Sequence, residues 1–127
     1  MSVAEIGAVT GRGEPNSEWL RIGRASDVPL LEGRSVDVGG WRIAVFRLPD
    51  GWVAADHACP HQGGPLGDGI VADRCVTCPL HNQRFSLETG ERQDAEGPGV
   101  RMYEVRERAG QLELRRAGLA DRLEPAA

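Results

Sequence analysis

Glycine and proline interrupt this chain so often that few stretches are long enough to form a helix. The sequence contains 17 Gly and 8 Pro among 127 residues, and both residue types are unfavourable in helix interiors. The short segments between them alternate apolar and polar residues, which is the pattern of half-buried strands. A chain of this length is typical of one domain. We therefore expect a single all-β domain of short antiparallel strands.

The clearest strand pattern covers residues 41–48, and the turn Pro49-Asp50-Gly51 separates it from a second predicted strand at 52–55. These two segments are expected to pair as a hairpin. Residues 1–17 have no periodic pattern and predict a flexible N-terminal arm, whereas residues 117–127 form a C-terminal tail. Further strands are predicted at residues 19–22, 35–38, 70–71, 75–77, 84–87, 100–106 and 111–114.

The charge and the cysteine count limit the possible functions. The formal net charge is −4 and every basic residue is Arg, which argues against nucleic-acid binding and excludes a Schiff-base lysine. No apolar run approaches the ~18 residues of a membrane span, and the first residues lack the pattern of a signal peptide. We therefore expect a cytoplasmic protein without nucleic-acid or membrane partners. Three cysteines, an odd number, favour metal binding or a free thiol over a disulfide framework.

Two short segments carry the residues best suited to chemistry, Cys59-Pro60-His61 and Cys78-Pro79-Leu80-His81. Each segment supplies one thiolate and one imidazole, and strand pairing can bring the two loops face to face. Thiolate and imidazole ligands select zinc, copper or iron over hard cations. No pair of carboxylates suggests acid–base catalysis, and we predict no catalytic residue. The candidate metal and cofactor ligands are Cys59, His61, Cys78 and His81.

Zinc and iron–sulfur chemistry both suit this ligand set. Two Cys and two His satisfy a closed tetrahedral zinc site. Structural zinc sites generally take like ligands from one loop, whereas each loop here donates one of each kind. Mixed pairs instead fit a binuclear cluster with both thiolates on one iron and both imidazoles on the other. A binuclear iron cluster is therefore favoured over zinc, and a zinc-stabilised interaction module remains as an alternative.

The segment from Cys59 to Glu91 resembles the cluster-binding subdomain of Rieske iron–sulfur proteins, in which two Cys and two His hold a 2Fe-2S cluster. The resemblance covers about residues 19–115. It implies an antiparallel β sandwich or partly open barrel across residues 18–116, with a small cluster-binding subdomain at about residues 57–92. It also implies that Gly97-Pro98-Gly99 is the proline-containing loop that lies over the cluster in this family.

Residues beside the two motifs bear on the reduction potential. Gly63 and Gly64 lack Cβ atoms, so the backbone of the first loop can approach a sulfur. Respiratory Rieske proteins add a disulfide between the ligand loops and a serine hydroxyl directed at a sulfide. The corresponding positions here are Gly64, Leu80 and Gln83. With both devices missing, we predict a potential near the bottom of the range of roughly −150 to +300 mV for Rieske centres.

Such a domain is most simply a one-electron carrier with no catalytic site of its own. The run from Cys59 to Leu66, followed by Gly69-Ile70-Val71 and by residues 76–82, is similar to the small subunit of NAD(P)H-dependent assimilatory nitrite reductase. This resemblance implies a large subunit with flavin and sirohaem as the redox partner. The alternative is the ferredoxin component of a bacterial ring-hydroxylating dioxygenase, whose partners are a flavin reductase and an oxygenase.

Five other conspicuous residues are assigned structural roles. Cys75 is expected to be a buried strand thiol, because Cys is among the residues most often buried. His57 is expected to be an exposed loop histidine. The tryptophans are expected to pack in the core or on hairpins, and they are Trp19, Trp41 and Trp52.

Overall fold

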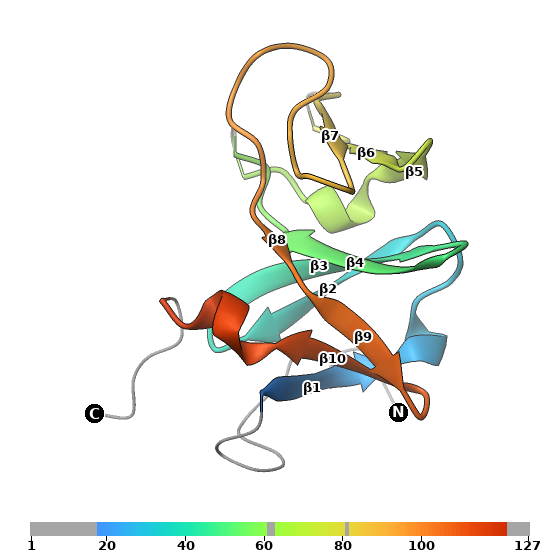
Figure 1. The fold of residues 1–127 in the computed structure, drawn as a ribbon. Coiled ribbons are helices and arrows are strands. Elements are labelled where there is room, and N and C mark those ends of the chain that lie inside the picture. Colours follow the sequence, from blue (N-terminus) through green and yellow to red (C-terminus); the bar gives the residue numbers. More distant parts are fainter. Residues whose placement is uncertain (1–17, 61–62, 81, 122–127) are drawn as a thin grey trace.

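The computed structural model describes residues 18–60, 63–80 and 82–121. Across these residues the chain is all-β apart from short 3₁₀ helices, and its strands form three antiparallel sheets (Figure 1). The strands are β1 (Trp19–Arg24), β2 (Gly33–Val38), β3 (Trp41–Leu48), β4 (Gly51–Asp56), β5 (Ile70–Ala72), β6 (Cys75–Thr77), β7 (Arg84–Ser86), β8 (Met102–Tyr103), β9 (Val105–Arg108) and β10 (Gln111–Arg115). The 3₁₀ helices are η2 (Ala25–Asp27), η3 (Leu66–Asp68) and η4 (Arg116–Leu119).

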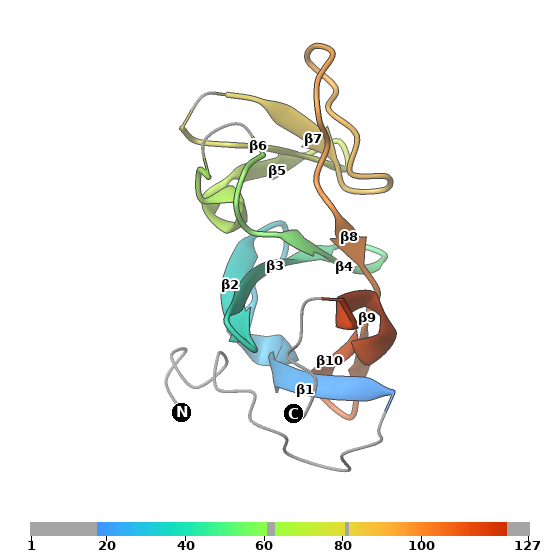
Figure 2. The same cartoon turned by 90° about the vertical axis from the view of Figure 1, so that its left-hand side faces the viewer.

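Two of the sheets enclose the first hydrophobic core. One sheet has the strand order β1-β10-β9 and the other has the order β2-β3-β4-β8. Figure 2 shows the two sheets packed together, with the third sheet beyond them. Alternate residues of β1 and β10 point into this core and are buried, as period-two strands require. They are Leu20, Ile22, Leu112 and Leu114. This arrangement confirms the predicted antiparallel β fold.

β3 separates two hydrophobic cores, and its predicted position at residues 41–48 is confirmed. Ile43 and Val45 belong to the first core, whereas Ala44 and Phe46 belong to a second core on the opposite face of the strand. Burial of both faces explains the nearly continuous apolar run in this strand. The predicted hairpin with β4 is also present, and Leu48 lies opposite Gly51.

The prediction of a single strand at residues 100–106 is wrong, because the structure divides this segment at Glu104. β8 pairs with β4 and β9 pairs with β10, so the two parts belong to different sheets. Tyr103 is buried in the first core, and its hydroxyl donates to the Asp56 carboxylate (2.6 Å). The Glu104 carbonyl accepts a hydrogen bond from the Arg115 N–H (2.9 Å). No Gly or Pro lies within residues 101–106 to mark this change of sheet.

The third sheet, β5-β6-β7, stands at one end of the molecule (Figure 1). The second core lies between this sheet and β3, and it contains both Cys59 and Cys78. η3 lies close against β2, because a Cβ atom at Gly33 would be only 2.7 Å from the Gly67 carbonyl oxygen. The fold therefore places both candidate ligand cysteines in the core beneath the third sheet.

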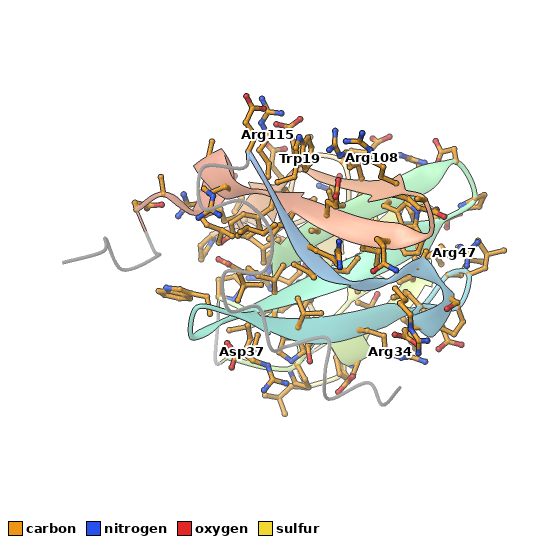
Figure 3. The ribbon with its side chains drawn as sticks, turned by 90° about the horizontal axis from the view of Figure 1, so that it is seen from below. Trp19, Arg34, Asp37, Arg47, Arg108 and Arg115 are labelled. Atoms are coloured by element: carbon orange, nitrogen blue, oxygen red, sulfur yellow. The ribbon has the colours of Figure 1, made fainter. Side chains whose placement is uncertain are left out.

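The far end of the molecule carries tryptophan and arginine side chains, seen in Figure 3. Trp19 lies beside Arg115 there, and the Arg115 and Arg106 guanidinium carbons are 5.2 and 4.0 Å from the Trp19 ring centroid. Trp52 packs against the first core and donates its Nε1–H to Glu107 (3.0 Å). Trp41, at the start of β3, is 42% exposed. The tryptophans therefore pack on strand surfaces and not inside the cores.

The C-terminal tail begins with η4, in which Leu119 is fully buried in the first core. The residues of the predicted arm, 1–17, and residues 122–127 lie outside the described part of the chain. In the described residues, no helix is both long enough and apolar enough to cross a membrane.

Candidate metal centre

The loop that follows β4 carries Cys59 and is closed by its own backbone. The Cys59 N–H donates to the Gly64 carbonyl (2.9 Å), and the Gly63 N–H donates to the Cys59 carbonyl (2.7 Å). Gly63 has a φ of +70°, a conformation that glycine adopts without a steric cost. A bridge between Ala58 and Pro65 pairs the two ends of this loop. Cys59 is thereby held with only 3% of its surface exposed.

The loop that follows β6 carries Cys78 and repeats the same hydrogen-bond pattern. The Cys78 N–H donates to the Gln83 carbonyl (2.7 Å), and the Asn82 N–H donates to the Cys78 carbonyl (2.9 Å). Asn82 has a φ of +60°, in the position that Gly63 occupies in the first loop. In both loops the cysteine therefore bonds to the residues four and five positions later.

The two loops contact each other at the cysteine sulfurs. A Cβ atom at Gly64, the closing residue of the first loop, would lie 2.7 Å from the Cys78 Sγ. Gln83, the closing residue of the second loop, has its Oε1 3.3 Å from the Cys59 Sγ. Each loop thus ends against the cysteine of the other loop. Both cysteines belong to the second core.

The donor set suits an iron–sulfur cluster. Both cysteines lie in a buried apolar core and neither is in a disulfide, and thiolate sulfur is a ligand that such clusters require. Gly64 leaves space at the Cys78 sulfur that any side chain would fill. His61 and His81 lie outside the described residues, and within residues 18–60, 63–80 and 82–121 no three potential metal ligands converge. The two described cysteines fit one half of a mixed Cys and His site.

Gln83 is a residue of this site whose role the sequence did not show. Its position identified it only as the replacement for a serine. In the structure the side chain is 6% exposed and touches the Cys59 sulfur. A buried amide retains its need for hydrogen bonds. The signal available in the sequence was its place five residues after Cys78, which matches the place of Gly64 after Cys59.

His57 and Cys75 occupy structural positions near the loops. His57 is half-buried, which corrects the expected exposed position, and its Nδ1 accepts a hydrogen bond from the Gly67 N–H (3.1 Å). Burial lowers the pKa of His57, and the charge of Arg42 lowers it further. Cys75 lies on β6 opposite Ala72 and Ser86 and is partly buried, less than expected.

The segment after β7 returns close to the site. Arg92 pairs with Phe85 of β7, and its guanidinium makes two hydrogen bonds with the Asp94 carboxylate (3.0 and 3.1 Å). A Cβ atom at Gly97 would lie 2.9 Å from Arg92 Nη1, so the Gly97-Pro98-Gly99 segment lies against this side chain. The hydrogen bond to Asp94 chiefly raises the pKa of Arg92, and the Cys59 charge adds to this increase. Arg92 therefore pairs with a residue of the second core, which also contains Cys59.

Comparisons with known proteins agree with this geometry. The chain is 34% identical over 99 residues to the ferredoxin subunit of anthranilate 1,2-dioxygenase from Burkholderia cepacia, an alignment that covers 77% of this chain and 92% of that protein. A structure described as the small subunit of an NADH-dependent nitrite reductase from Mycobacterium tuberculosis matches with a TM-score of 0.69 and 28% identity. That match covers 76% of this chain and 92% of the other.

A third match is a complex of reduced oxygenase and oxidized ferredoxin in carbazole 1,9a-dioxygenase, with a TM-score of 0.69, 27% identity, and coverage of 79% of this chain and 94% of the matched one. The family model for the Rieske-like 2Fe-2S domain matches residues 18–115. The relatives and the family model agree on a 2Fe-2S cofactor and on electron transfer. The chain therefore belongs to the Rieske-like 2Fe-2S domain family and is an electron carrier.

Proposed function

We propose that this chain holds its cluster through Cys59, His61, Cys78 and His81, in a cluster-binding subdomain of about residues 57–92. The observation that carries this proposal is the matched pair of loops, which bring two buried sulfurs together through contacts at Gly64 and Gln83. His61 and His81 belong to the same two loops, two and three residues after the cysteines. When bound, the cluster accepts and releases one electron.

The chain's own residues contribute binding, orientation and electrostatics. The second core keeps water from the two sulfurs, since Cys59 and Cys78 are 3% and 0% exposed. Backbone hydrogen bonds fix the two cysteines in their loops, so the positions of these two sulfur ligands are preorganised. In the described residues, no cysteine is in a disulfide, and Gly64 stands at one of the positions that a disulfide between the ligand loops would need. This supports a potential in the lower part of the Rieske range.

The proposed partner is the large subunit of an NAD(P)H-dependent nitrite reductase that contains flavin and sirohaem. Two observations support it: the sequence of the two ligand loops, and the structural match to the small subunit from Mycobacterium tuberculosis, which covers nearly all of that chain. In this assignment the chain is an accessory electron-transfer subunit in the cytoplasm. Three cysteines without a disulfide agree with a reducing compartment.

A ferredoxin component of a ring-hydroxylating dioxygenase is the second candidate. The observation that favours it is the 34% identity to the anthranilate 1,2-dioxygenase ferredoxin subunit, the highest identity among the three matches described above. In that assignment the partners are a flavin reductase and an oxygenase. The complex of oxygenase and ferredoxin in carbazole 1,9a-dioxygenase shows that a protein of this fold can dock on such a partner.

Reconstitution with both partner systems tests the assignment. The purified chain is added to a sirohaem nitrite reductase large subunit with NAD(P)H, and separately to a flavin reductase and oxygenase pair. We expect the chain to increase nitrite reduction in the first system and to leave product formation in the second unchanged. The Cys59→Ser variant serves as the inactive control. Turnover that depends on the chain only in the oxygenase system would contradict the nitrite reductase assignment.

A further inference from the structure

Gln83 contacts both ligand loops, as Gly64 does, but it reaches the first loop through a polar side chain. Its backbone carbonyl accepts the hydrogen bond from the Cys78 N–H (2.7 Å). Its side-chain amide lies 3.3 Å from the Cys59 Sγ. With 6% exposure it is one of two buried polar residues in the described part of the chain, together with Ser86. In a buried place of low dielectric constant, a hydrogen bond between this amide and the sulfur is stronger than it would be in water.

The donor of the hydrogen bond between Cys59 and Gln83 must change when Cys59 becomes a metal ligand. In the metal-free chain the Cys59 thiol donates to Gln83 Oε1. A ligand cysteine is a thiolate, which has no proton to donate and repels a carbonyl oxygen. A half-turn of the amide about its terminal bond puts the Nε2 group at the sulfur, where it can donate. The amide is therefore suited to both states of the cysteine.

We propose that Gln83 is a positioning residue that tunes the cluster, with its Nε2 group donating a hydrogen bond to the Cys59 sulfur in the loaded protein. The proposal rests on the ligand role of Cys59 given above. Reduction adds one negative charge to the site, so a hydrogen bond to a ligand sulfur is stronger in the reduced state. Gln83 therefore raises the midpoint potential above the value expected from the missing serine and disulfide.

A redox titration of matched variants tests this role. Gln83→Leu keeps the approximate size of the side chain and removes the donor. We expect about a tenfold lower electron affinity, which is about 59 mV for a one-electron couple. Gln93→Leu is the control, because Gln93 is exposed and its amide bonds to the Glu91 carbonyl. The midpoint of this control should equal that of the wild type.

Gln83→Glu gives a second readout that a packing role would not change. An ionised carboxylate cannot donate and adds charge, so the midpoint at neutral pH should lie below that of Gln83→Leu. Midpoints of Gln83→Leu or Gln83→Glu equal to that of Gln93→Leu would overturn the proposal.

One measurement needs no variant at residue 83. Glutamine labelled with ¹⁵N in the side-chain amide is incorporated into a Gln62→Ala protein, because residue 62 stands in the first ligand loop. Pulsed EPR of the reduced protein should then show coupling to an amide ¹⁵N, and its absence would overturn the proposal. If the unlabelled wild type contains no cluster, the proposed function fails. A wild type with a cluster and no effect of residue 83 leaves that function standing and refutes only the role of Gln83.

Discussion

Gly64→Ala should damage the metal centre through a single methyl group. The added Cβ atom would lie 2.7 Å from the Cys78 Sγ and 3.1 Å from the Leu80 Cβ. The optimal separation of nonbonded carbon atoms is about 3.5–4.0 Å, so the two ligand loops must move apart by about 1 Å. Metal sites need their ligands within about 0.5 Å of the correct position. We therefore expect both lower stability and lower cluster content.

The size of the stability change follows from the cost of overpacking, which is about 1–3 kcal/mol. An unfolding entropy of about 2.1 cal/mol/K per residue, over about 100 ordered residues, corresponds to about 5 °C per kcal/mol. The melting temperature should therefore fall by about 5–15 °C. Circular dichroism of the protein as isolated measures this change, and iron per chain measures the loading.

Two glycine controls separate crowding from a general effect of glycine substitution. A Cβ atom at Gly63 would have no neighbour within 4 Å, although its φ is +70°. Gly63→Ala should cost about 1–2 kcal/mol of strain and retain the iron. A Cβ atom at Gly118 would make an ordinary contact of 3.4 Å with Tyr103, so Gly118→Ala should leave both quantities unchanged. Full iron content and an unchanged melting temperature in Gly64→Ala would refute the close contact of the two loops.

Three further predictions concern the ligand set, the second core and the Asp94 carboxylate. Cys78→Ser should lose the cluster, whereas Cys75→Ser should retain it, as measured by iron and sulfide content; loss of the cluster in both would show that the ligand set is wrong. Leu66→Ala should lower the free energy of unfolding by about 2–5 kcal/mol, because the side chain is fully buried in the second core. Hydrogen bonds from Arg92 and the Arg84 N–H lower the pKa of Asp94, so the stability that its carboxylate contributes is present above pH 3.8 and is lost at lower pH. The difference in melting temperature between the wild type and Asp94→Asn should therefore shrink as pH falls below about 4.

The strands were predictable where the sequence pattern is strong. β3 and β6 have the predicted bounds, because an apolar run or a short β-branched segment lies between clear turn residues. The division into β8 and β9 was not predictable, because the change of sheet at Glu104 depends on the partner strands and not on residues 100–106 themselves. Local propensity favours the formation of a strand, whereas pairing with distant strands decides to which sheet that strand belongs.

The cofactor class of the candidate site was predictable from the sequence, whereas its electrostatics were not, and the set of four ligands stays a prediction. The two cysteines are conspicuous in the sequence, and the structure brings their loops together at Gly64 and Gln83. The sequence comparison treated Gln83 only as a missing serine, since no local pattern shows that its amide reaches across to Cys59. The place of Arg92 beside the second core was missed for the same reason, because it depends on the pairing with Phe85.

The central claim is that two Cys and two His jointly hold a 2Fe-2S cluster in this chain. The most direct test combines iron and acid-labile sulfide analysis with pulsed EPR of the reduced protein as isolated. The claim predicts two irons and two sulfides per chain, a rhombic EPR signal, and two strongly coupled nitrogens that are lost when His61 and His81 are replaced. One zinc per chain without sulfide, or a reduced cluster without coupled histidine nitrogen, would contradict it.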